Sequence, residues 1–268
     1  MEEKLKAQFY TGNYKAIIET VSPEKESNPG VLILLLRSLI QMGQSLKSVQ
    51  VPNVPTQNLK TLFSYLNGTS SAQAAKDSLE QDSLNATLSS IININEGDYS
   101  QVIDNLKPDS PEHLALLLCA LLNFKRADSA AQLLESAMSQ HEDEPLLEIV
   151  QTFVQIAKGD YEEAYSTLVE LSQQFGESVS LMNAIGICAL EDSNYPEAEH
   201  AFTRALELSR DFGIKQDIAT SLKNLVACKR QKGEDPSSYE EELYSLDPNH
   251  EYFQTKNSAS ELFDKLIS

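Results

Sequence analysis

The chain has 268 residues, of which 41% are apolar and 23% charged, with ten glycines and ten prolines. This composition is typical of a folded globular protein and excludes a long disordered or low-complexity region. Asp and Glu total 40 against 21 Lys and Arg, which gives a net charge of −19. We expect this surface to repel phosphate backbones and anionic lipid headgroups. The charge therefore excludes nucleic acid as a partner and direct membrane insertion.

The first predicted element is a helix hairpin over residues 2–21, with Gly12-Asn13-Tyr14 at its turn. The N-terminus has no basic segment followed by an apolar one, so we expect no secretory signal and a reducing, cytoplasmic compartment. A second hairpin is predicted from 31–42 and 57–66, followed by a helix at about 71–80. The twelve residues 31–42 are the most apolar stretch, but a membrane span needs about 20, so they predict a buried helix.

Residues 45–56 interrupt the helical rhythm. This segment is rich in β-branched residues and prolines, which favour extended backbone over helix: Val49, Val51, Pro52, Val54 and Pro55. We therefore expect a protruding loop or a small extended hairpin inserted between two helices.

The rest of the chain repeats a pattern of paired helices. Five further hairpins are predicted at 84–106, 112–140, 145–174, 178–210 and 217–246, with a C-terminal helix from about 258. The connection at 211–217 is longer than such a repeat needs.

One short phrase recurs at the predicted turns. Besides Gly12-Asn13-Tyr14, it occurs as Gly97-Asp98-Tyr99, Gly159-Asp160-Tyr161 and Ser193-Asn194-Tyr195. A glycine can supply the left-handed residue that ends one helix, and Asp or Asn can cap the next. The phrase therefore predicts a turn between two helices in which the tyrosine covers the joint.

The spacing of small residues identifies the repeat. Ala130, Ala164 and Ala198 are 34 residues apart, which is the period of the tetratricopeptide repeat. The fullest match combines Met182, Ile185, Gly186 and Ala189 with Ala198, Phe202 and Ala205. The fold prediction is an all-α, tetratricopeptide-like helical-repeat solenoid forming one domain over 1–268, with about six to seven helix pairs, a C-terminal helix and a concave inner face.

Two predicted helices carry apolar stripes that are displaced from the core positions of this repeat. One stripe includes Leu146, Ile149, Phe153 and Ile156, and the other includes Leu88 and Ile91. Either these repeats pack in a shifted register that buries the stripes, or the stripes line an apolar groove that binds a partner. Helix 114–124 has the same ambiguity because it has no evident solvated face.

No motif for catalysis or cofactor binding is present. The sequence has no Gly-rich phosphate loop, nucleophile elbow, zinc-binding helix pair or calcium loop, so we predict a protein that is not an enzyme and binds no cofactor. The run His141-Glu142-Asp143-Glu144 is read either as a metal site or as a solvated turn. The three cysteines, Cys119, Cys188 and Cys228, lie in apolar helices and are interpreted as core residues.

Three segments together resemble the epsilon subunit of the coatomer vesicle coat. They are Phe9-Tyr10-x-Gly12-x-Tyr14-x-Ala16-Ile17-Ile18, the repeat at 181–208, and Asp247-Pro248-x-His250 to Phe263-Asp264-Lys265-Leu266. The resemblance implies a non-catalytic subunit of the COPI coat for Golgi-to-ER and intra-Golgi transport, cytoplasmic and peripheral on Golgi and vesicle membranes.

The resemblance also implies a partner, the C-terminal domain of the coatomer alpha subunit, around which the repeats would wrap. Its expected contacts are Leu146, Ile149, Phe153, Ile156, Leu88, Ile91, Val51 and Val54, the last two from the insertion at 45–56. The alternative is a general tetratricopeptide adaptor or co-chaperone. A chaperone-type carboxylate clamp is disfavoured, because Asn183 occupies one clamp position but Ile187 and Leu190 occupy the next.

Overall fold

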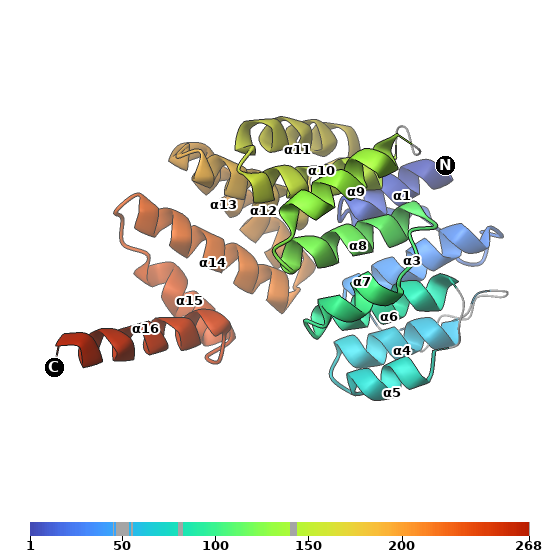
Figure 1. Cartoon of the computed structure of the whole chain (residues 1–268), viewed down its shortest axis with the longest axis horizontal. Coiled ribbons are helices and arrows are strands. Elements are labelled where there is room, and N and C mark those ends of the chain that lie inside the picture. Colours follow the sequence, from blue (N-terminus) through green and yellow to red (C-terminus); the bar gives the residue numbers. More distant parts are fainter. Residues whose placement is uncertain (45, 47–53, 55, 80–82, 140–143, 268) are drawn as a thin grey trace. The chain divides into compact units, whose positions relative to one another are not determined.

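The computed structural model describes residues 1–44, 46, 54, 56–79, 83–139 and 144–267. Across these residues the chain is helical and contains no strand, which confirms the all-α prediction (Figure 1). The chain divides into two compact units, unit 1 over Met1–Gly176 and unit 2 over Glu177–Ser268. The expected extended insertion falls almost wholly outside the described residues, and a single domain over 1–268 stays a prediction.

Unit 1 consists of helices that mostly form hairpins with their neighbours in the chain, with an additional short helix over Ala72–Asp77. They are α1 (Glu2–Tyr10), α2 (Tyr14–Thr20), α3 (Pro29–Gln41), α4 (Thr56–Leu66), α5 (Ala72–Asp77), α6 (Ser83–Asn95), α7 (Tyr99–Asn105), α8 (Pro111–Asn123), α9 (Ala127–Met138), α10 (Pro145–Lys158) and α11 (Tyr161–Phe175).

Unit 2 continues the same pattern and ends in a single helix. It contains α12 (Val179–Glu191), α13 (Tyr195–Phe212), α14 (Lys215–Gln231), α15 (Ser237–Leu246) and α16 (Glu251–Ile267).

Two predicted boundaries in unit 2 are wrong. Helix α13 runs on to Phe212 and is ended by Gly213 in the left-handed conformation, so only Gly213 and Ile214 separate it from α14. Helix α16 begins at Glu251 rather than near 258. The backbone N–H of Tyr252 donates to His250 Nδ1, so a side chain just before α16 satisfies one of its free N–H groups.

The recurring turn phrase forms the predicted turn in all four places. Its tyrosines begin α2, α7, α11 and α13, and the residue two positions earlier has positive φ, including 61° at the non-glycine Ser193. The expected capping hydrogen bond is absent, because the Asn or Asp side chain makes no cap bond at any of the four helices. The Nδ2 of Asn13 instead donates to the carbonyls of Phe175 and Gly176, both at 2.9 Å.

The repeat core is the most accurate part of the fold prediction. Ala130, Ala164 and Ala198 are all fully buried, as are Phe202 and Ala205. A Cβ atom added to Gly186 would lie only 2.4 Å from Cε1 of Phe202, so the ring occupies the space that the glycine leaves open. A small residue on each helix therefore allows the close crossing that the 34-residue spacing predicted.

The N-terminal hairpin of unit 1 packs against the last two helices of the same unit. Helix α1 contacts α10 and α11 as well as α3, and the Asn13 bonds hold the α1–α2 turn to the end of α11. Arg37 of α3 pairs with Glu112 of α8 at 2.5 Å and lies over the ring of Phe9, 4.6 Å from its centroid. Unit 1 therefore closes on itself, which the sequence did not predict.

Helix α8 is covered from several sides by neighbouring helices. It packs against α6, α7, α9 and α10, which buries Leu114, Leu118 and Leu121 among its other apolar residues. Most of segment 114–124 is therefore used in internal packing, although Leu116, Cys119 and Leu122 are only half-buried and Asn123 and Phe124 are exposed.

A cluster of side chains around the carboxylate of Glu240 joins α16 to α14 and α15. Glu240 accepts hydrogen bonds from Arg230, Lys256 and Tyr252. Burial opposes ionisation of Glu240, but these donors outweigh it and lower its pKa from 4.5 to about 2. Since the pKa is lower in the folded state, the cluster stabilises the fold fully above about pH 4.5 and loses that effect as the pH falls towards 2.

This linkage predicts the acid response of a Glu240→Gln variant. We expect the drop in urea unfolding midpoint between pH 5 and pH 3 to be smaller in Glu240→Gln than in the parent, because glutamine cannot be protonated. Glu241→Gln, at an exposed neighbour on α15, should keep the parent's drop. An equal drop in the parent and in Glu240→Gln would contradict the assignment.

Candidate partner-binding surface

The apolar stripe of α10 is divided between the core of unit 1 and its surface. Leu146 and Ile149 are buried at 8% and 7% exposure, and Leu146 packs in a cluster with residues of α8 and α9. Ile156 is half-buried, whereas Phe153 is 40% exposed. In the free chain, Leu146 and Ile149 therefore serve internal packing, as the shifted-register explanation expects, and Phe153 is the member of the stripe left open to a partner.

The second expected stripe, on α6, is mostly internal too. Leu88 is fully buried in a cluster with residues of α3, α4 and α5, and Ile91 and Val54 are half-buried against that cluster. Val51 lies outside the described residues. The structure thus does not bring the α6 stripe to the surface as a continuous apolar face.

The sequence placed Ile187 at a groove position but did not identify it as a partner contact, although it is the counterpart of Phe153 in the next repeat. Ile187 of α12 lies 34 positions after Phe153, and it too is exposed, at 36%, although its neighbours Gly186 and Cys188 are buried. The repeat spacing could have identified it, since each residue occupies the same place on the first helix of its hairpin. Helix α10 of unit 1 thus presents Phe153 to solvent, and α12 of unit 2 presents Ile187.

The polar residues near Ile187 are engaged within unit 2. Asn183 Nδ2 donates to the Val179 carbonyl and to Ser221 Oγ, and Asn224 Nδ2 donates to Asn183 Oδ1 at 2.8 Å. Leu190, the other predicted groove position, is buried. Asn183 is therefore part of the contact between α12 and α14. A clamp for a peptide carboxylate would instead need the Asn183 side chain free to bind the peptide.

One arrangement in unit 1 superficially resembles a catalytic triad. His113 Nδ1 lies 2.5 Å from Asp109 Oδ1, and His113 Nε2 lies 3.2 Å from Thr87 Oγ1. Both His113 and Thr87 are buried, so a substrate has no approach to the hydroxyl in this packing. The three residues instead tie the start of α8 to α6.

The cysteines are packed among apolar helices, and burial lowers the reactivity of their thiols. Cys188 and Cys228 are buried, while Cys119 is less completely covered. Burial raises the pKa of the Cys119 and Cys188 thiols to about 11, which keeps them protonated and unreactive at neutral pH. Among the described residues there is no cluster of three or more His, Cys, Asp or Glu arranged to hold a metal ion, and residues 141–143 of the acidic run lie outside them.

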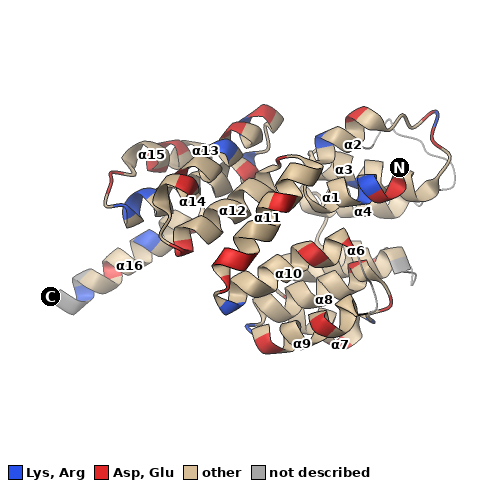
Figure 2. Ribbon diagram, turned by 90° about the horizontal axis from the view of Figure 1, so that it is seen from above, with Lys and Arg blue, Asp and Glu red and all other residues tan. Residues whose placement is uncertain are grey.

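The surface of both units is predominantly acidic. Figure 2 shows Asp and Glu residues spread over helices of unit 1 and unit 2, in keeping with the net charge of −19. None of the helices, over the part of the chain that the structure describes, is long and apolar enough for a bilayer span.

Comparisons with known proteins give the family. A family model described as the coatomer epsilon subunit matches residues 4–268. Coatomer subunit epsilon-2 of Oryza sativa subsp. indica is 23% identical over 97% of this chain and 94% of its own length. Coatomer subunit epsilon-2 of Arabidopsis thaliana is 23% identical over 98% and 94%, and the probable coatomer subunit epsilon of Schizosaccharomyces pombe is 25% identical over 82% and 83%. Because the family match extends over nearly the whole chain, this protein belongs to the coatomer epsilon subunit family.

Proposed function

We propose that this chain is a non-catalytic structural subunit of the COPI coat that supports Golgi-to-ER and intra-Golgi transport. Membership of the coatomer epsilon family supports assembly into a hetero-oligomeric coat. The proposed partner is the C-terminal domain of the coatomer alpha subunit, and the proposed location is the cytoplasmic face of Golgi and vesicle membranes, reached through the coat.

The observation that carries the partner-binding role is the exposure of Phe153. A phenylalanine that is 40% exposed on the first helix of a repeat, with Ile156 half-buried one turn later, offers an apolar anchor that a partner can cover. Aromatic residues that become fully desolvated in an interface commonly dominate its affinity. Of the four apolar residues expected to contact the partner on α10, we therefore retain Phe153 and Ile156 as the proposed contacts.

Phe153→Asp tests this role. We expect the variant to bind the C-terminal domain of the alpha subunit about thirtyfold more weakly, as loss of a dominant anchor costs about 2 kcal/mol or more. The measurement is isothermal titration calorimetry with the purified domain, after circular dichroism has shown that the helix content and melting temperature of the variant match the parent.

A matched control separates the site from a general effect of a new surface charge. Leu66, at the end of α4, is also 41% exposed, and Leu66→Asp should retain parental affinity. If Phe153→Asp folds normally and binds as tightly as the parent, α10 does not contact this partner.

A further inference from the structure

A groove in unit 2 lies between α14 and α16. Two adjoining cavities of about 840 and 650 Å³ share Lys223 and Glu251 in their walls and continue along α14. We call them together the α14–α16 groove. Its charged lining consists of Lys215, Lys223, Arg230, Lys256, Asp247 and Glu251.

The lining reverses the charge balance of the surrounding protein. Residues 177–268 contain nine Lys and Arg against seventeen Asp and Glu, yet four of those nine cations and only two of those seventeen acids line the groove. A cation-rich cleft in an acidic unit concentrates field lines and attracts an anionic ligand.

These cations are only partly neutralised. Arg230 and Lys256 share a single carboxylate, that of Glu240, which leaves one positive charge in excess. Lys223 pairs with Glu251 at 3.0 Å, but Glu251 is three-quarters exposed, and an exposed pair of this kind is readily exchanged for another carboxylate. Lys215 makes no ion pair among the described residues.

The cations are arranged in a line along one helix. Lys215, Lys223 and Arg230 are eight and seven residues apart on α14, which is about two turns each, so they follow one face about 11 to 12 Å apart. An extended peptide advances about 3.3 Å per residue, so carboxylates three to four residues apart would meet successive cations. A single lipid headgroup is too short to reach from Lys215 to Arg230, about 22 Å away along the axis.

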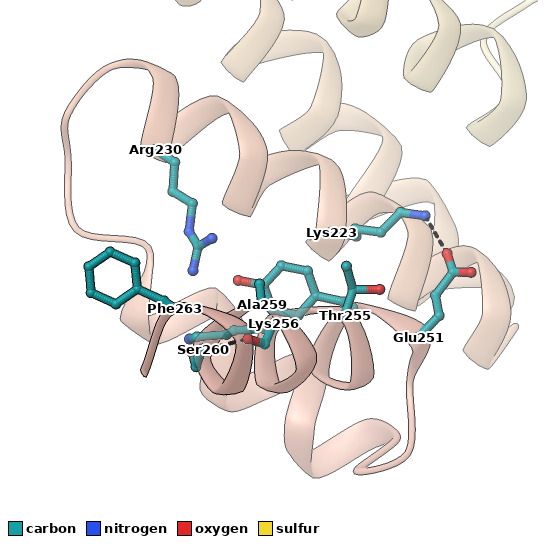
Figure 3. Close-up of a pocket in the computed structure, with 9 residues that line it drawn as sticks. Lys223, Arg230, Glu251, Thr255, Lys256, Ala259, Ser260 and Phe263 are labelled. Carbon is teal, nitrogen blue, oxygen red and sulfur yellow. Dashed lines mark hydrogen bonds and ion pairs between the residues drawn. The ribbon is translucent and has the colours of Figure 1, made fainter. Parts of the chain in front are cut away.

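One end of the groove carries an exposed aromatic side chain beside its cations. Figure 3 shows Arg230 pointing from α14 towards α16, with Phe263 at that end and Lys223 with Glu251 at the other. Phe263 is 62% exposed, and Ala259 lies one turn before it in the same wall. An exposed phenylalanine beside a row of cations suits a ligand that carries both acidic and apolar side chains.

We propose that the α14–α16 groove is a second docking surface, which binds an extended acidic segment of a partner protein with an apolar side chain against Phe263. All residues of the groove belong to unit 2, so the proposal does not depend on whether Phe153 of unit 1 contacts the alpha subunit.

The absence of tryptophan from the chain allows a direct test. In a Phe263→Trp variant of the full chain, the single indole reports on the groove, and Phe124→Trp, at a 52% exposed position of unit 1, is the matched control. The probe is a twelve-residue peptide that repeats Glu-Glu-Leu four times, compared with the same peptide carrying Gln for Glu. We expect the acidic peptide to shift the emission of Phe263→Trp but not that of Phe124→Trp, and the effect to weaken with added salt.

Two charge variants then assign the cations. In the Phe263→Trp background, Lys215→Gln/Lys223→Gln should weaken binding of the acidic peptide by about five- to tenfold. Lys4→Gln/Lys158→Gln, which removes the same charge from exposed sites of unit 1, should not. No emission change up to millimolar peptide, equal binding of the Gln peptide, or unchanged affinity of Lys215→Gln/Lys223→Gln would overturn the proposal. Binding to phosphatidylserine vesicles without binding to the peptide would overturn it in favour of a lipid headgroup.

Discussion

Phe202→Ala is expected to lower the free energy of unfolding by about 3–5 kcal/mol, the largest effect of a single substitution proposed for this chain. Phe202 is fully buried in the α12–α13 hairpin, and its ring covers the bare backbone of Gly186. Removing the ring leaves a cavity at a glycine, which has no side chain to fill it. Urea unfolding followed by circular dichroism measures the loss.

The same contact predicts a non-additive pair of substitutions. Gly186→Ala alone should cost about 1–3 kcal/mol, because its Cβ would lie 2.4 Å from the Phe202 ring. In the Phe202→Ala background, that methyl group enters the vacated space, so the cost should shrink or change sign. Strict additivity of the two substitutions would show that Gly186 and Phe202 do not pack as described.

Arg37→Met is expected to destabilise the chain by about 2–3 kcal/mol. Arg37 and Glu112 have only 11% and 25% of their side chains exposed, and Oε1 of Glu112 has no hydrogen-bond partner among the described residues apart from its ion pair with Arg37. Removing the arginine leaves a carboxylate poorly solvated and unpaired between α3 and α8, and also removes the cation over the Phe9 ring. The cost is smaller than for a fully buried pair because Glu112 keeps some contact with water.

A compensating variant distinguishes loss of charge pairing from loss of side-chain volume. Arg37→Met/Glu112→Leu should recover most of the stability, since an apolar pair of similar size avoids the desolvation cost. Thermal unfolding of the single and double variants, with Lys15→Met as an exposed control on α2, makes the comparison. If the double variant is less stable than Arg37→Met, charge is not the main contribution of this pair.

Local sequence patterns determined most of the helices and the turns between them, although not the end of α13 or the start of α16. The four Gly/Ser-Asn/Asp-Tyr phrases mark their turns correctly, because a left-handed residue and the helix start after it depend on neighbouring residues alone. The 34-residue spacing of Ala130, Ala164 and Ala198 likewise determined where the helices of each hairpin cross, since only a small side chain permits the close approach.

Only the tertiary structure decided which apolar residues stay accessible. Ile149 and Phe153 lie one turn apart on α10 and read alike in the sequence, yet one is buried and the other is open to solvent. Two contacts join segments more than seventy residues apart. Helix α1 packs on α10 and α11, where Asn13 bonds to the end of α11, and Arg37 pairs with Glu112. The accessibility of a side chain depends on which distant surfaces cover it, and no periodicity within one helix contains that information.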